Sequence, residues 1–112
     1  MNIFALSSGI GPSGIAILRL SGNSVIRIVR NITKNKILKH KEVNFCKFYN
    51  PIDNSILDEG ILLLFNKPNS FTGEDLAEFH IHGSNAVINS FLNVFSSQEN
   101  CRLAEPGEFT KI

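Results

Sequence analysis

The sequence predicts an α+β domain with a single mixed sheet, two helices on one face of that sheet and the element order β-β-α-β-β-β-α-β. Two observations support this fold class. Short segments that are apolar throughout, or that alternate between apolar and polar residues, are typical of strands. Two further segments space their apolar residues at i, i+3, i+4 and i+7, as one face of a helix requires. The length of 112 residues fits one domain, so we expect residues 1–112 to form a single unit.

The first half of the chain predicts two strands and a helix. Met1–Leu6 is a short apolar strand, and Ile15–Leu20 is a central strand that is apolar on both faces up to Arg19. We expect Ser21-Gly22-Asn23 to cap a helix that ends near Thr33. The inward residues of this helix are Val25, Ile28, Val29 and Ile32.

The second half predicts three strands, a helix and a final short strand. A lysine-rich connection at 34–41 precedes the first of these strands, and a turn at 51–55 follows it. We expect the second helix to begin at Ser84 or Asn85. The expected strands are Val43–Tyr49, Ile56–Phe65, 76–82 and Cys101–Ala104, and the expected inward helix residues are Val87, Ile88, Phe91, Leu92 and Phe95.

The central strands predict a second layer of cover for the sheet. Ile15–Leu20 and Ile61–Phe65 are apolar on both faces, whereas two helices can cover only one face. The other face then needs a second copy of the chain or further chain. We expect a homodimer.

Charge excludes a domain-wide attraction for polyanions. Eleven basic and ten acidic residues leave a formal charge of +1, so a charge-based partner would have to use a local patch. The lysines at 34, 36, 39 and 41 are interpreted as a solvated loop, because no aromatic residue is interleaved with them to stack bases.

The remaining composition predicts a soluble, cytoplasmic protein that does not bind a membrane. Cys46 and Cys101 lie far apart without ligand spacing, which favours two reduced thiols. The N-terminus lacks a signal-peptide pattern, and no apolar run approaches the ~20 residues of a membrane helix.

The glycine-rich loop does not predict a nucleotide site. Gly9, Gly11 and Gly14 spell G-x-G-x-x-G, but a strand follows where a dinucleotide site needs a helix. Ile15-Ala16 stand where a P-loop needs Lys-Ser/Thr. A hairpin loop remains the favoured interpretation.

The strand around Glu78 carries the densest group of ionisable side chains. Glu78, His80 and His82 share one face with Leu76, opposite apolar neighbours. They could bind a metal, a heterocycle or a partner. No fourth ligand is visible, so we expect no metal. The alternative is that the two histidines are half-buried and bonded to backbone groups, and this is the favoured interpretation for His80.

Arg19 ends an apolar strand, where an unpaired guanidinium would be costly. Glu78 is the candidate partner. One hypothesis is a purely structural ion pair. The other is that both groups turn toward a ligand with a planar donor edge and an anionic or carbonyl part.

Five segments of the chain form a recognisable pattern: Gly14-Ile15-Ala16-Ile17-Leu18-Arg19-Leu20-Ser21-Gly22, Leu57-Asp58-Glu59-Gly60, Pro68-Asn69-Ser70-Phe71-Thr72-Gly73-Glu74-Asp75, Glu78 with His80-Ile81-His82-Gly83, and Ala104-Glu105-Pro106-Gly107-Glu108-Phe109-Thr110. In order and spacing they resemble the N-terminal domain of the MnmE (TrmE) family of tRNA modification GTPases. The resemblance covers essentially the whole chain. One departure is Ser84, where the family often has a second glycine after the histidine.

The resemblance implies a fold similar to the tetrahydrofolate-binding part of aminomethyltransferases. It also implies a homodimer, strand-exchanged or face-to-face, with 5-formyltetrahydrofolate at the interface. In the family, an arginine at the end of the second strand and a glutamate in the motif strand contact the folate, and they correspond to Arg19 and Glu78. No catalytic residue is expected within this chain.

The resemblance further implies a role in modifying the C5 position of wobble uridine in tRNA, together with a flavin-containing partner protein. In that family, GTP, Mg²⁺ and K⁺ belong to a GTPase domain. That domain, the helical domain and a lysine that contacts folate in the continuation of the family have no counterpart in this sequence. The alternative is a stand-alone metal-binding or folate-dependent one-carbon transfer enzyme. Because no nucleophile–base pair or P-loop is visible, the favoured hypothesis is a ligand-binding and dimerisation module of a tRNA modification GTPase.

Overall fold

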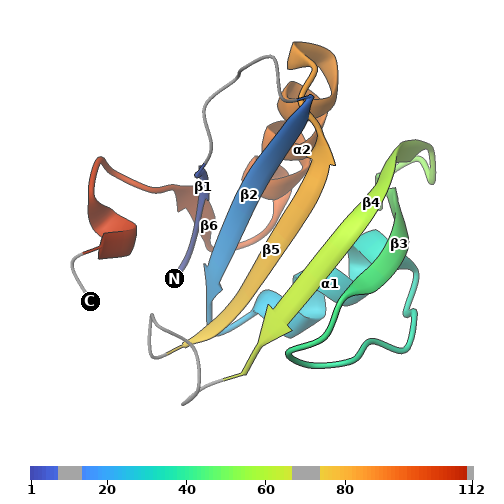
Figure 1. Cartoon of the computed structure of the whole chain (residues 1–112). Coiled ribbons are helices and arrows are strands. Elements are labelled where there is room, and N and C mark those ends of the chain that lie inside the picture. The colour runs from blue at the N-terminus through green and yellow to red at the C-terminus, as the bar shows by residue number, and fades with distance from the viewer. Residues whose placement is uncertain (8–13, 67–73, 111–112) are drawn as a thin grey trace.

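The computed structural model describes residues 1–7, 14–66 and 74–110, and its elements follow the predicted order (Figure 1). Most of the glycine-rich loop and most of the 68–75 motif lie outside the described residues. A short 3-10 helix that the sequence did not predict closes the described chain. The elements are β1 (Asn2–Leu6), β2 (Ile15–Gly22), α1 (Val25–Thr33), β3 (Asn44–Tyr49), β4 (Ile56–Phe65), β5 (Asp75–His82), α2 (Asn85–Ser97), β6 (Cys101–Leu103) and η1 (Glu108–Thr110).

The six strands form one mixed sheet in the order β3-β4-β5-β2-β1-β6. Every neighbouring pair is antiparallel except β1 and β6, which run parallel. The edge strands β3 and β6 carry the two cysteines, and both thiols are free. Opposite edges of a six-stranded sheet lie about 24 Å apart at ~4.8 Å per strand, far beyond disulfide reach. The prediction of two unpaired thiols is confirmed.

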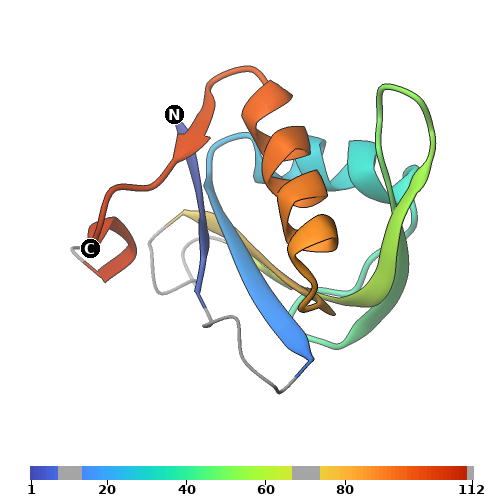
Figure 2. The same ribbon diagram turned by 90° about the horizontal axis from the view of Figure 1, so that it is seen from above.

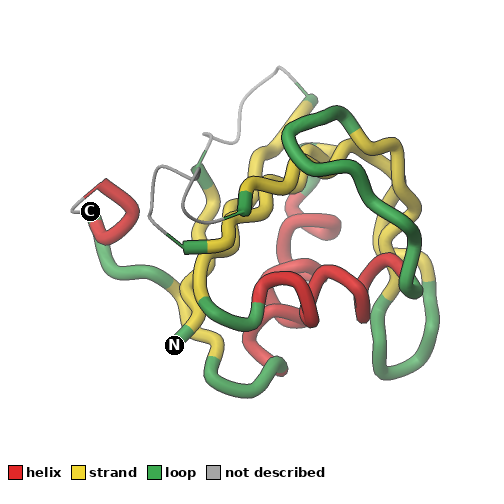
Figure 3. The backbone as a smooth tube through the Cα atoms, turned by 90° about the horizontal axis from the view of Figure 1, so that it is seen from below, coloured by secondary structure: helices red, strands yellow, loops and turns green. Residues whose placement is uncertain are grey.

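Both α-helices lie on the same face of the sheet (Figures 1 and 2), as predicted. The core fills the space between them and that face, which Figure 3 shows from below. Its centre is a group of tilted and edge-to-face aromatic rings, with Phe79 of β5 at 5.4 Å from Phe48 and 5.3 Å from Phe95. Such offset ring pairs are favourable beyond the area they bury, so β5 is fixed firmly in the middle of the domain.

The predicted cap of α1 is wrong, because β2 continues through Gly22 and the N-cap residue is Ser24. The Ser24 side chain makes no capping bond. Instead, the Ser24 backbone N–H donates to Asn2 Oδ1 over 2.8 Å. Gly22 has a φ of +151°, and a Cβ there would lie 2.2 Å from the same Asn2 oxygen. The Asn2 side chain of β1 therefore caps α1, a role that the sequence predicted for residues 21–23. At α2 the prediction is confirmed, since Ser84 Oγ accepts from Val87 N–H at 3.2 Å.

The sheet face opposite the helices, called here the open face, is not covered by either helix, as expected from central strands that are apolar on both faces. Leu18 and Leu62 on the helix side are fully buried. On the open face, Ile15 is 56% exposed, and Ile61 and Leu63 are half-buried. Strand neighbours shield one another within the plane of the sheet, but neither α-helix packs on this side. The open face is therefore a half-covered apolar surface with charged groups in its middle.

Within the part of the chain that the structure describes, neither helix has the length and apolar content needed to cross a bilayer.

Candidate functional site

Arg19 and Glu78 lie directly opposite each other across the β2–β5 pair. Residues opposite each other in antiparallel strands point to the same face, so both side chains project onto the open face. Arg19 Nε donates to Glu78 Oε2 at 2.8 Å. The carboxylate side chain is 13% exposed and the guanidinium side chain 34%. The predicted pairing of these two residues is confirmed.

The second oxygen of Glu78 faces His80, two residues along the same strand. His80 Nε2 lies 3.4 Å from Glu78 Oε1. This contact corrects the expectation that His80 has backbone partners. A carboxylate has about four acceptor positions, and these two contacts occupy one on each oxygen. Glu78 can thus accept further donors without giving up Arg19.

His82, the third ionisable side chain on this face of β5, contacts a different carboxylate. His82 Nδ1 lies 2.8 Å from Asp58 Oδ1, and the His82 backbone N–H donates to Asp58 Oδ2 at 2.8 Å. Burial raises the pKa of Asp58, but the hydrogen bonds from His82 and from the Glu59 backbone outweigh it and hold that pKa below its ordinary value. Neither the role of Asp58 as a partner nor the pairing of β4 with β5 was visible in the sequence.

This division of partners bears on the metal hypothesis. His80 contacts Glu78, whereas His82 contacts Asp58 on β4. Across residues 1–7, 14–66 and 74–110, no three His, Cys, Asp or Glu side chains are grouped as a metal site requires.

A cavity of about 610 Å³ opens beside Arg19. Its size falls within the ~300–1,000 Å³ typical of small-molecule sites. The end of β1 forms one wall, and the segment after β6 forms the other. The lining residues are Ala5, Leu6, Ser7, Arg19, Leu103, Ala104, Glu105, Pro106, Gly107, Glu108 and Phe109. Sequence reasoning did not find this cavity, although the 104–110 segment was part of the family pattern.

The outer wall of this cavity is held in place by Arg102. Arg102 donates through Nη1 and Nη2 to the two oxygens of Glu108 at 2.8 and 2.6 Å. Glu108 Oε1 also accepts from the Glu105 backbone N–H at 2.9 Å. A two-pronged Arg–carboxylate pair fixes orientation as well as distance, so residues 105–108 form a shaped wall. Arg19 lines this cavity and also pairs with Glu78.

A second cavity of about 220 Å³ has His80 and His82 of β5 in its lining, together with Ile15 of β2 and residues 59–61 of β4. Neither Arg19 nor Glu78 lines this second cavity. An apolar wall with one guanidinium, next to a carboxylate with acceptor capacity, suits a flat ligand that has both N–H donors and anionic or carbonyl oxygens.

Comparisons with known proteins give one consistent family. The family model described as "GTP-binding protein TrmE N-terminus" matches residues 2–112. A tRNA modification GTPase MnmE from Pelagibacter ubique is 50% identical over 100% of this chain and 25% of its own length. MnmE from Bartonella henselae is 45% identical over 97% of the chain and 25% of its own length. The mitochondrial tRNA modification GTPase gtpbp3 from Dictyostelium discoideum is 44% identical over 97% of the chain and 22% of its own length. The chain spans about a quarter of the length of these relatives.

Proposed function

Because the chain belongs to the TrmE N-terminal family, we propose that it is the folate-binding and dimerisation domain of a tRNA modification GTPase. The proposed ligand is 5-formyltetrahydrofolate, bound by Arg19 and Glu78. The observation that supports this proposal best is the 2.8 Å pair between Arg19 and a Glu78 carboxylate that keeps acceptor capacity, beside a cavity of small-molecule size.

The chemistry of the ligand matches these two groups. A pterin ring presents adjacent N–H donors, and a carboxylate can accept them in pairs. Arg19 pairs with this carboxylate and can donate to oxygens of the ligand. The apolar part of the cavity, from Leu6 to Phe109, would cover the ring. Bound in this way, the folate is held and oriented by the domain, and the chain itself performs no chemical step.

The proposed role of the parent protein is modification of the C5 position of wobble uridine in tRNA, in the cytoplasm and with a flavin-containing partner. The folate would supply the one-carbon unit. GTP hydrolysis with Mg²⁺ and K⁺ would belong to the remainder of such a protein, because the relatives are about four times longer than this chain.

The proposed homodimer would use the open face. Phe45 is 72% exposed, Ile15 is 56% exposed, and Val43 is 53% exposed. Ile61, Leu63, Glu78 and His80 on the same face are half-buried. Covering this surface with a second copy would remove apolar area from water at roughly 25 cal/mol per Å². It would also enclose the Arg19–Glu78 pair, which raises the strength of its contacts to a ligand.

Glu78→Gln tests the folate assignment. The amide keeps the shape of the carboxylate but replaces one acceptor oxygen with a donor, so affinity for 5-formyltetrahydrofolate should fall at least about tenfold, or ~1.4 kcal/mol. Calorimetric titration of the wild-type and variant chains measures this difference. Glu99→Gln, at an exposed position just after α2, is the matched control and should retain wild-type affinity.

Thermal unfolding of the same variants separates the two hypotheses for Glu78. If its role is only to pair with Arg19, Glu78→Gln strands a partly buried guanidinium, and the midpoint should fall clearly while folate affinity stays unchanged. That result would contradict the proposed site. A loss of affinity with little change in the midpoint supports it.

A further inference from the structure

The connection between α1 and β3 concentrates the positive charge of the chain. Residues 25–41 contain six of the eleven basic residues and none of the ten acidic ones. The remainder of the chain therefore has five basic against ten acidic side chains. A net charge of +1 thus conceals one basic region on an otherwise acidic domain. The longest dimension of the domain is 32 Å, whereas charges are screened over about 8 Å at physiological salt, so a ligand at this region feels mainly the local charge.

The basic side chains of this region are exposed and are not neutralised by carboxylates. We call the set Arg30, Lys36, Lys39, His40 and Lys41 the α1–β3 basic surface; each member is exposed. Among the described residues, no Asp or Glu forms an ion pair with any of them. The first acidic residue along the chain is Glu42.

The backbone that bears this surface is held in a defined shape by Asn44. Asn44 is buried, and its Oδ1 accepts from the Lys39 N–H at 2.8 Å while its Nδ2 donates to the Lys39 carbonyl at 2.8 Å. The Lys41 N–H donates to the Leu64 carbonyl of β4 at 2.8 Å. These bonds remove much of the ordering cost that a flexible lysine loop would bear on binding.

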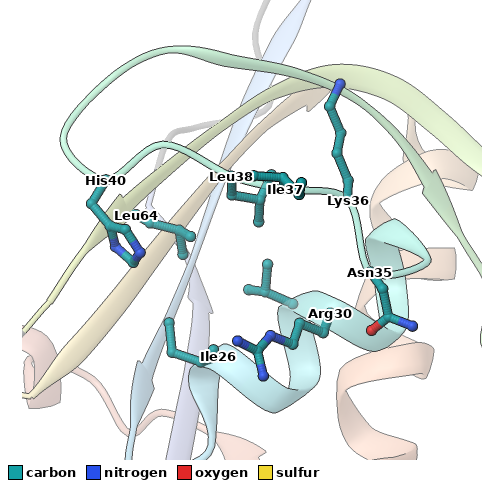
Figure 4. A pocket seen from close by; sticks show the side chains of 9 residues that line it. Ile26, Arg30, Asn35, Lys36, Ile37, Leu38, His40 and Leu64 are labelled. Atoms are coloured by element: carbon teal, nitrogen blue, oxygen red, sulfur yellow. The ribbon is translucent and has the colours of Figure 1, made fainter.

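A cavity of about 260 Å³ lies within the basic surface, between α1 and the connection (Figure 4). Ile26 of α1 and Leu38 of the connection line opposite sides of the cavity, Arg30 lies next to Ile26, and Leu64 lies next to His40. Lys36 and Asn35 complete the polar part of its lining. An anion at the mouth would meet several donors next to low-dielectric side chains, where charge attraction is stronger than in open water.

We propose that the α1–β3 basic surface binds the sugar-phosphate backbone of RNA, with one phosphate held at the mouth of this cavity between Arg30 and His40. Arg and Lys side chains on a fixed backbone are the usual contacts to phosphate oxygens. No Phe, Tyr or Trp side chain lines the cavity, and the proposed contacts go to phosphate oxygens, so we expect binding that is independent of sequence. The choice of RNA over an acidic protein rests on the proposed function, in which the parent protein acts on tRNA.

The test is titration of a fluorescein-labelled RNA stem-loop with the chain of 112 residues, followed by anisotropy at several salt concentrations. Each phosphate contact contributes about −0.7 to −0.9 to the slope of log affinity against log salt. Three contacts predict a slope of about −2.1 to −2.7, which is a loss of roughly 20- to 40-fold between ~50 and ~200 mM salt. A second stem-loop of different sequence should bind with equal affinity.

Lys39→Gln and Lys47→Gln form a matched pair, since both remove one exposed lysine. Lys39 belongs to the basic surface, whereas Lys47 lies on β3 opposite Glu59. Lys39→Gln, and separately Arg30→Gln, should weaken binding at least about threefold and make the slope shallower by roughly 0.7–0.9. Lys47→Gln should do neither. Circular dichroism confirms that each variant is folded.

Three results would overturn the proposal. They are an absence of binding at low salt, an equal loss for Lys47→Gln, and a slope that Arg30→Gln and Lys39→Gln leave unchanged. Glu78→Gln should leave RNA binding at the wild-type level, so failure of the folate assignment and failure of the RNA surface are separately visible.

Discussion

Asp58 joins two strands through a single carboxylate. Its side chain is 11% exposed and accepts hydrogen bonds from both the backbone and the ring of His82. Burial alone would raise the pKa of this group, but these bonds to the ionised form hold the pKa below 3.8. The pairing was not visible in the sequence because it depends on how the ends of β4 and β5 meet, whereas the Arg19–Glu78 pair followed from strand alternation and the cost of an unpaired guanidinium.

Asp58→Asn is expected to remove part of the acid dependence of folding. Since the folded-state pKa is depressed, Asp58 contributes stability that is present above the unfolded pKa of about 3.8 and is lost as the pH falls through the folded value. Urea unfolding across the acid range measures the free energy of unfolding for both chains. The difference between wild type and variant should be largest at neutral pH and shrink below pH 3.8. An equal difference at every pH would contradict the assigned role.

Cys46 is buried and Cys101 is half-buried, so both thiols are shielded from solvent. Loss of solvent around the Cys101 thiol raises its pKa to about 11, and the same cause raises the pKa of Cys46. The thiolate is the reactive form, so both cysteines should react with iodoacetamide far more slowly in the folded chain than in urea at pH ~8. Mass spectrometry of timed samples counts the labels. Rapid labelling of either thiol in the folded chain would show that its burial is wrong.

At the scale of elements, the two helices differ in how their N-termini are completed. The side chain of Ser84 caps α2, whereas α1 depends on Asn2 of β1. The α2 cap followed from the sequence because the capping residue is adjacent to the helix. The α1 cap did not, because its partner lies 22 residues away along the chain. Local signals therefore located both helices but identified only one of their caps.

Ser84→Ala should destabilise the domain by about 1 kcal/mol, because the Val87 N–H loses its acceptor. Denaturant unfolding at neutral pH measures the change. Ser90→Ala is the control. Ser90 is exposed within the same helix and only donates back to the Ala86 carbonyl, so its loss should be within ~0.5 kcal/mol of wild type. Equal effects of the two changes would rule out a specific cap.

At the scale of the whole molecule, the sequence predicted the sheet, the helix side and the unpaired cysteines, because those depend on periodicity and length. It did not predict the cavity beside Arg19 or the basic surface at α1. The cavity needs β1 and the segment after β6 to lie together, and the parallel β1–β6 pair is set by the whole fold. The lysine run was interpreted as a loop, since the packing that brings it beside Arg30 is not visible in the sequence.

The open face should make the chain dimeric at micromolar concentration. Phe45→Glu places a charge at a 72% exposed apolar position on that face and should shift the mass measured by light scattering toward the monomer. Ile37→Glu is the matched control and should leave the measured mass unchanged. Ile37 is 93% exposed, but it lines the cavity between α1 and the α1–β3 connection and not the open face. A wild-type chain that is monomeric and cooperatively folded would contradict the dimer.

The most direct test of the central claim is a crystal structure of this chain with 5-formyltetrahydrofolate. The account predicts pterin N–H donors within about 3.2 Å of the Glu78 carboxylate and ligand oxygens at a similar distance from Arg19. The ring should occupy the cavity that Leu6 and Phe109 line. A folate molecule that is bound without contact to either Arg19 or Glu78 would contradict the account.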